Sequence, residues 1–306
     1  MIALLVLPLL APFVATPLAQ RVVGRLDSAA ALWTLTVTTL VLALSSLAAL
    51  GTLLIAGALK ASAPAKLGQL IHPLSVGPAA VIYPATALSV GMLVACAATV
   101  SHSALRQSRQ FRAARSQADA RPLGGDLCVL DEAHADAYAL PGKPGRIVVT
   151  TGMLRALAPA EREVLFAHER AHLTGRHHYF LVAADLAAHC HPGLRKLRTA
   201  ITLTVEHAAD EAAASATGDR LLTARAVARA ALAGRGAPRS RPSFAPSATT
   251  GPVPRRVTAL LKPPNRRRLA PAVVALLLCT TASAAGALGG LASLHHRVEI
   301  AQGESG

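Results

Sequence analysis

The chain has 306 residues, of which 52% are hydrophobic but only 3% are aromatic, and its mean hydropathy is +0.42. This composition excludes an ordinary soluble globular protein, because so few aromatic side chains would not fill a soluble core of this size. The net charge of +15 favours anionic partners, but without stacking platforms or a nucleic-acid-binding module we expect no direct nucleic-acid binding. The charge is better explained by membrane topology and by contact with the lipid bilayer.

Residues 1–100 contain three apolar segments, 2–18, 30–59 and 79–100, that lack Asp, Glu, Lys and Arg. Each is long enough, or nearly so, to cross about 30 Å of hydrocarbon. The first segment is short and contains three prolines, so a signal peptide is the alternative. We interpret it as a membrane helix because no basic region precedes it. The sequence therefore predicts three transmembrane helices within residues 1–100.

A small sheet is expected after the third apolar segment. The runs 126–130 and 146–151 are apolar or β-branched and are bounded by Gly and Pro turn signals. Proteins commonly bind an extended peptide by adding it as a strand at a sheet edge. We expect residues 147–150 to be such an edge strand beside an active site; a purely structural hairpin is the alternative.

The segment His168-Glu169-Arg170-Ala171-His172 carries the chemistry of the chain. A proline-containing turn with acidic residues precedes it and predicts a helix. Residues four apart share a helical face, so both histidines can bind one zinc ion. Zinc lowers the pKa of a bound water to about 7, and the neighbouring Glu can accept its proton. The motif therefore predicts a zinc peptidase with Glu169 as catalytic base.

Two residues could provide the third metal ligand. His178 completes a metzincin-like pattern with Gly175, but metzincins also need a methionine turn downstream of the motif. All methionines precede the motif, at Met1, Met92 and Met153. Glu206 could instead complete a His2Glu set, with Asp210 one helical turn further on accepting the free ring N–H of a ligating histidine. We favour Glu206 and keep His178 as the alternative.

The remaining segments complete the predicted domain organisation. Residues 101–235 would form a peptidase domain, and 236–268 a flexible linker rich in Pro, Ser and Arg. The apolar segment 269–294 predicts a fourth transmembrane helix, followed by a short extracytoplasmic tail, 295–306. Basic residues follow the third span and precede the fourth, which places the peptidase domain on the cytoplasmic side of a multi-pass membrane protein, most simply in a bacterial plasma membrane.

These motifs resemble the gluzincin core of integral-membrane peptidases. The resemblance also includes Ala-Tyr-Ala-Leu-Pro at 137–141 and the run 147–154. Two related groups share this core, the BlaR/MecR-type antirepressor peptidases and the group of HtpX and the CAAX prenyl proteases. Three spans before the motif and one after it resemble the BlaR/MecR type more closely. The resemblance implies a helical membrane protein of about four transmembrane helices with a cytoplasmic α+β gluzincin-like zinc peptidase domain.

The resemblance also implies roles for single residues. One zinc ion per chain would be bound by His168, His172 and Glu206, with Glu169 as base and Asp210 supporting the ligands. The sequence departs from the family pattern after the second histidine, where Arg, His and His occupy positions 176–178 and an acid is frequent in the family.

Two functions are compatible with these patterns. The first is a zinc-dependent endopeptidase that cuts a protein or peptide substrate in the cytoplasm or near the membrane; the resemblance implies a transcriptional repressor as one such substrate. The second is a non-catalytic membrane signalling or scaffold protein with a structural zinc site. Five interdependent site residues favour the first, because a protein without activity has little reason to keep them together.

Overall fold

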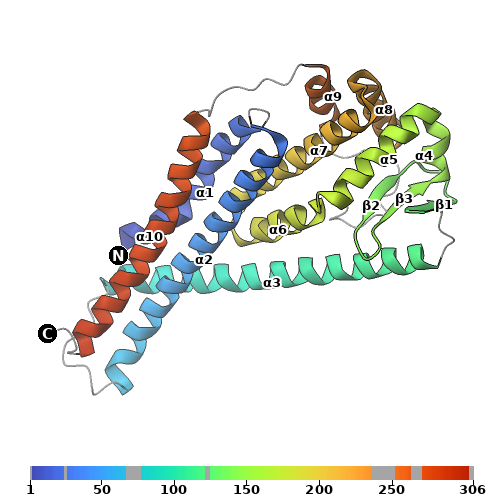
Figure 1. The fold of residues 1–306 in the computed structure, drawn as a ribbon. Coiled ribbons are helices and arrows are strands. Elements are labelled where there is room, and N and C mark those ends of the chain that lie inside the picture. The colour runs from blue at the N-terminus through green and yellow to red at the C-terminus, as the bar shows by residue number, and fades with distance from the viewer. Residues whose placement is uncertain are drawn as a thin grey trace.

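The computed structural model describes residues 2–23, 26–66, 77–120, 125–235, 252–262 and 271–302. It is mostly helical with one small mixed sheet (Figure 1), which confirms the predicted fold class. Among the described residues, four helices are long and apolar enough to cross a membrane. They are α1 (Ile2–Val22), α2 (Ser28–Lys66), α3 (Ala79–Asp119) and α10 (Pro271–Gln302). Their length and composition support a multi-pass membrane protein.

Helix α1 stays helical although it contains three prolines. Pro12 has no N–H, so the carbonyl of Pro8 loses its donor within the helix. The hydroxyl of Ser46 on α2 donates to that carbonyl at 3.0 Å. A neighbouring helix thus supplies the missing hydrogen bond, which is how proline is tolerated within a helix bundle in lipid.

Helices α1 and α10 approach closely at Gly286. A Cβ atom there would lie 2.9 Å from the carbonyl oxygen of Leu4, so a larger residue would push the two helices apart. Small residues allow this kind of packing in lipid, where no hydrophobic force drives helices together. Helix α10 runs through residue 302, so most of the predicted 295–306 tail is helical; residues 303–306 lie outside the described part.

The sheet contains β1 (Leu127–Leu130), β2 (Ala137–Leu140) and β3 (Arg146–Thr150) in the order β1-β3-β2. Strand β3 pairs parallel with β1 and antiparallel with β2. The expectation that residues 147–150 form an edge strand is therefore wrong, because both sides of β3 are already paired. All five of its residues are buried, as is typical of a strand enclosed on both faces. Strand β2 is the edge that contacts α5.

Helices cover both faces of this sheet. On one face the C-terminal half of α3 contributes Phe111, Ala114 and Ala118 to a cluster with Tyr138 and Val148. The other face packs against α4 (Thr151–Ala156), α5 (Pro159–Thr174) and α8 (Arg220–Ala233). Helix α3 therefore continues well beyond its predicted apolar span, because its polar half supports the sheet.

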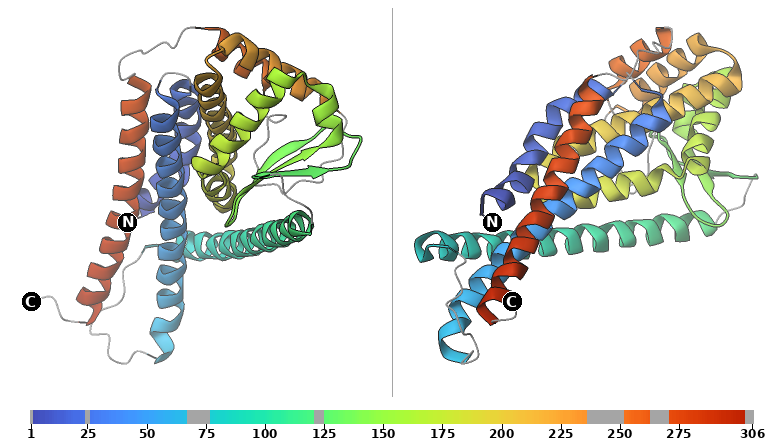
Figure 2. Two further views of the ribbon diagram at one scale, coloured as in Figure 1. Left: turned by 45° about the vertical axis from the view of Figure 1, so that its right-hand side comes forward. Right: turned by 60° about the vertical axis from the view of Figure 1, so that its left-hand side comes forward.

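A helical hairpin connects this region to the long apolar helices. It consists of α6 (His177–Cys190), the short 3-10 helix η1 (Pro192–Leu194) and α7 (Arg195–Thr217). Alanine and leucine side chains from α6 and α7 share one buried cluster with α1, α2 and α10. Figure 2 shows the hairpin beside these helices. The helices around the sheet and the long apolar helices are thus packed against each other through this hairpin.

Helix α9 (Val253–Leu261) lies within the segment predicted to be a flexible linker. Val253, Val257 and Leu260 share one helical face and pack against α7 and α8. The predicted linker is therefore interrupted by a packed amphipathic helix. Residues 236–251 and 263–268 of that segment lie outside the described residues.

Candidate metal centre

Helix α5 carries the histidine pair, and its start is fixed by local contacts. Pro159 is its first residue, where a missing N–H costs nothing. The carboxylate of Glu161 accepts a hydrogen bond from the backbone N–H of Ala158 at 2.9 Å. Arg229 of α8 pairs with the same carboxylate at 3.0 Å. These contacts fix the start of α5 against α8, and α5 also packs on α7.

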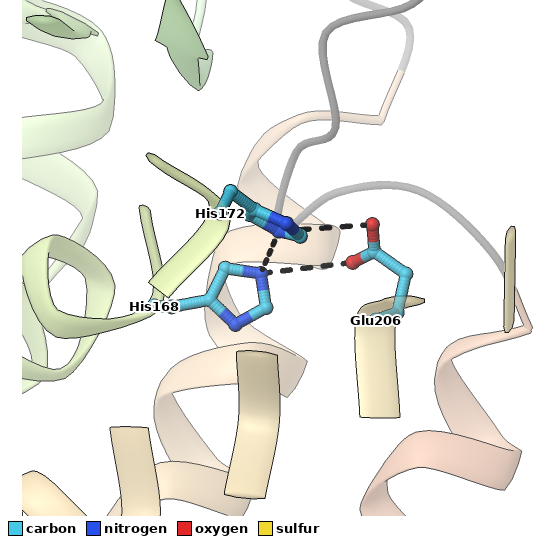
Figure 3. A group of neighbouring side chains, drawn as sticks. All are labelled: His168, His172 and Glu206. Carbon is cyan, nitrogen blue, oxygen red and sulfur yellow. Dashed lines mark hydrogen bonds and ion pairs between the residues drawn. The ribbon is translucent and has the colours of Figure 1, made fainter. Parts of the chain in front are cut away.

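His168, His172 and Glu206 meet between α5 and α7 (Figure 3). The two Nε2 atoms are 3.1 Å apart, and each lies 3.6 or 3.9 Å from a carboxylate oxygen of Glu206. Ligand atoms of a tetrahedral zinc ion are separated by about 3.3 Å when the bonds are about 2.0–2.1 Å long. The donor set and its spacing therefore fit one zinc ion, and the structure gathers Glu206 and not His178 at the predicted histidines.

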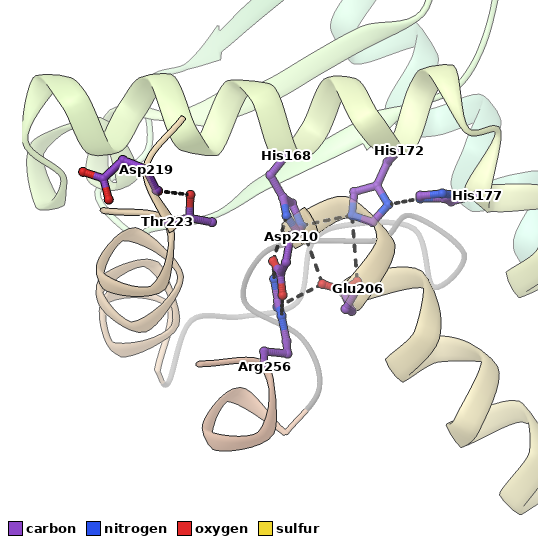
Figure 4. Close-up of polar contacts among 8 residues, drawn as sticks. All are labelled: His168, His172, His177, Glu206, Asp210, Asp219, Thr223 and Arg256. Carbon is purple, nitrogen blue, oxygen red and sulfur yellow. Dashed lines mark hydrogen bonds and ion pairs between the residues drawn. The ribbon is translucent and has the colours of Figure 1, made fainter. Parts of the chain in front are cut away.

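Both imidazoles have a partner on the ring nitrogen that faces away from the shared centre (Figure 4). Nδ1 of His168 lies 3.1 Å from a carboxylate oxygen of Asp210. Nδ1 of His172 lies 2.8 Å from Nδ1 of His177. A hydrogen bond at Nδ1 fixes the ring and leaves Nε2 for the metal. Asp210 thus lies beside the outer ring nitrogen of His168, and His177 lies at the equivalent position beside His172.

Residues 102–191, which include the histidine motif and the whole sheet, match the model of peptidase family M48. Over this segment the chain is similar to family M48, and the match together with the metal site indicates a zinc metallopeptidase. The segment and the site are called the M48 domain and the M48 site. The match ends before Glu206, and the fold supplies this third ligand from α7. No curated protein and no solved structure matches the chain.

Two residues around the M48 metal site were missed from the sequence. His177 follows Arg176, whose φ of 51° is in the left-handed region, so the chain turns sharply between α5 and α6 and brings His177 back to His172. From the sequence His177 could be a surface residue, a hydrogen-bond partner of a ligating histidine or a ligand, and no pattern decided among these roles. The second residue, Arg256 of α9, is completely buried and was assigned to the linker.

Arg256 binds both carboxylates of α7. Its Nε and Nη2 atoms donate to the two oxygens of Asp210 at 2.8 and 2.6 Å. Its Nη1 atom is 2.9 Å from Glu206. Burial lowers the pKa of Arg256, but the charges of Glu206 and Asp210 outweigh burial and raise it. The apolar spacing of α9 could have revealed the helix from the sequence, but not the contact.

The formal charges of the M48 site favour a divalent cation. Glu169, Glu206 and Asp210 are buried carboxylates and Arg256 is a buried cation, so the four together carry a charge of −2 when the histidines are neutral. Buried charge is costly unless it is compensated. One Zn²⁺ ion would bring the sum to zero.

Zinc uptake by the M48 domain is expected to release about one proton per ion at pH 7.5. Burial alone would lower the pKa of His168, but the adjacent carboxylates of Asp210 and Glu206 raise it to about 9 in the metal-free site. Burial lowers the pKa of His172, so this ring is already neutral. Zinc affinity should therefore fall as the pH decreases below about 9, by about tenfold per pH unit.

Calorimetry in two buffers of different ionisation enthalpy measures this proton release directly. His178→Asn should leave it unchanged, because the ring of His178 lies against Tyr179 and outside the metal-binding group. Zinc binding without proton release would contradict the expectation.

Proposed function

We propose that the M48 domain is an endopeptidase that hydrolyses peptide bonds of a cytoplasmic or membrane-proximal protein, with Glu169 as its catalytic base. The observation that supports this most strongly is the buried group of two Nε2 atoms and one carboxylate. Glu169 directly follows His168 on α5 and is completely buried. A purely structural zinc site is usually closed by four protein ligands, whereas three ligands leave a position for water.

Different residues of the chain have different roles in hydrolysis. A zinc ion held by His168, His172 and Glu206 would supply a Lewis acid and lower the pKa of a bound water. Glu169 accepts the proton of that water and returns it to the leaving amine. Asp210 and His177 fix the orientation of the two ligating rings, and Arg256 fixes the carboxylate of Glu206. The outer edge of β2, which contacts α5, is the part of the sheet to which a substrate strand could be added.

The location of the site supports a substrate near the membrane. His177 contacts His172, and Phe180, one helical turn further along α6, packs edge-to-face on Trp33 of α2 with ring centroids 5.0 Å apart. The side chain of Trp33 is 63% exposed, as expected of an aromatic residue at the membrane–water interface. The metal site would then lie about one helical turn from that interface.

The basic residues in the C-terminal half of α3 and those that precede α10 favour the cytoplasmic side for the M48 domain. Residues 101–235 would form this domain together with α9. Among cytoplasmic proteins, a transcriptional repressor is the substrate that the resemblance to BlaR/MecR-type peptidases suggests.

Zinc content and casein cleavage of the detergent-purified full-length protein test this function. We expect one zinc per chain and cleavage for the wild type. Glu206→Ala should lose both, because one of three ligands is removed, whereas His178→Ala should keep both. A wild-type protein that binds one zinc but cleaves neither casein nor a proteome-derived peptide mixture would favour the scaffold alternative instead.

A further inference from the structure

A cavity of about 420 Å³ lies between α6, the first half of α7 and the start of α9. Three basic side chains line it, those of His189, Arg195 and Arg198, together with the hydroxyls of Thr199 and Thr202. The volume is within the range of about 300–1,000 Å³ that is usual for small-ligand sites. The cavity is thus large enough for a head group and rich in groups that bind an anion.

The positive charge of this basic cavity is only partly neutralised. Asp185 pairs with Arg198 at 2.9 Å and also accepts hydrogen bonds from Ser103 at 2.8 Å and Gln107 at 2.6 Å. Its carboxylate is therefore fully engaged. Arg195 has no acidic partner among the described residues, and it is exposed. The basic cavity keeps an excess of positive charge.

Contacts of η1 show how deep the basic cavity lies. The hydroxyl of Thr16 on α1 donates to the carbonyl of Gly193 at 3.0 Å, and the ring of Phe13 packs on His191 with centroids 5.1 Å apart. Helix α1 ends at Val22. At 1.5 Å per residue, Thr16 lies about 9 Å from this end along the helix axis. Since α1 is just long enough to cross a bilayer, the tip of the hairpin lies roughly 9 Å inside that end.

A guanidinium at this depth needs a polar partner. Arg195 follows η1 directly, and its long side chain can extend toward the membrane surface, where phosphates of lipid head groups lie. Basic pockets between membrane helices bind anionic head groups in this way. A soluble acidic peptide matches the charge but would have to descend below the membrane surface, which makes the lipid the better match.

We propose that the basic cavity binds the phosphate of an anionic phospholipid from the leaflet next to the M48 domain. Arg195 and Arg198 pair with the phosphate oxygens. Pro252, which directly precedes α9, also lines the cavity. The bound lipid therefore contacts both the hairpin that bears Glu206 and the helix that bears Arg256.

Native mass spectrometry of the detergent-purified full-length protein, titrated with phosphatidylglycerol or phosphatidylcholine, tests the proposal. We expect one phosphatidylglycerol molecule to bind with preference over phosphatidylcholine. Arg195→Glu should weaken this binding by about tenfold or more. Lys196→Glu is the matched control, because it makes the same charge change at an exposed neighbour that does not line the basic cavity.

Three results would overturn the proposal: equal binding of the two lipids, equal losses in the two variants, or displacement of phosphatidylglycerol by a glutamate-rich peptide. The zinc content of each variant shows whether it has folded. If Arg195→Glu does not retain zinc, Arg195→Gln replaces it, because this substitution removes the charge without reversing it. We then expect a smaller decrease in phosphatidylglycerol binding.

Discussion

Glu169→Gln is expected to reduce kcat by about 1,000-fold or more and to leave zinc bound. The substitution keeps the size of the side chain but removes its ability to accept a proton. The three ligands of the M48 site do not include Glu169, so metal content should stay at the wild-type level. Cleavage rates measured together with metal analysis of the same samples separate the loss of chemistry from the loss of the metal.

Glu163→Gln provides the matched control for this experiment. Glu163 lies on the same helix but is exposed, so its substitution should change kcat by less than a factor of about two. A zinc-loaded Glu169→Gln protein with wild-type kcat would show that another group is the base. Loss of zinc in that variant would show that Glu169 helps to hold the metal.

Arg256→Met is expected to destabilise the zinc-free protein by about 3–5 kcal/mol, because Glu206 and Asp210 would lose their buried cation. With neutral histidines, the charge of the site would change from −2 to −3. Zinc then becomes the only cation facing three buried carboxylates, so added zinc should raise the Tm more in this variant than in the wild type. Thermal unfolding in detergent, with and without zinc, measures both effects.

Two further variants define the role of Arg256. Arg256→Lys keeps the charge but not the two-pronged contact with Asp210, so its loss of stability should be intermediate. Arg255→Met removes an exposed arginine from the same helix and should have little effect. If Arg255→Met and Arg256→Met lowered the Tm equally, the effect would belong to α9 and not to the buried ion pairs.

The parts of the M48 site that could be predicted from the sequence are those encoded by helical spacing. His168 and His172 are four residues apart, as are Glu206 and Asp210, and this spacing places each pair on one face of a helix. The four apolar helices were also predictable, because a long apolar segment without charged residues is favourable in the hydrocarbon of a bilayer.

The missed parts depend on tertiary contacts between segments far apart in the chain. The composition of 147–150 indicates a strand, but neither a partner nor an edge position, and the pairing with β1 makes β3 central. Arg256 follows Asp210 by 46 residues, and no local pattern connects them. His177 reaches His172 only because the chain reverses at Arg176.

The contribution of Arg256 also has a consequence for biosynthesis. During translation both histidines and Glu206 leave the ribosome before the arginine that neutralises their surroundings has been made. The M48 site therefore reaches its final charge balance only when the chain has been synthesised as far as α9, directly before α10. A nascent chain would thus acquire a complete active centre at about the time its last membrane helix is ready to insert.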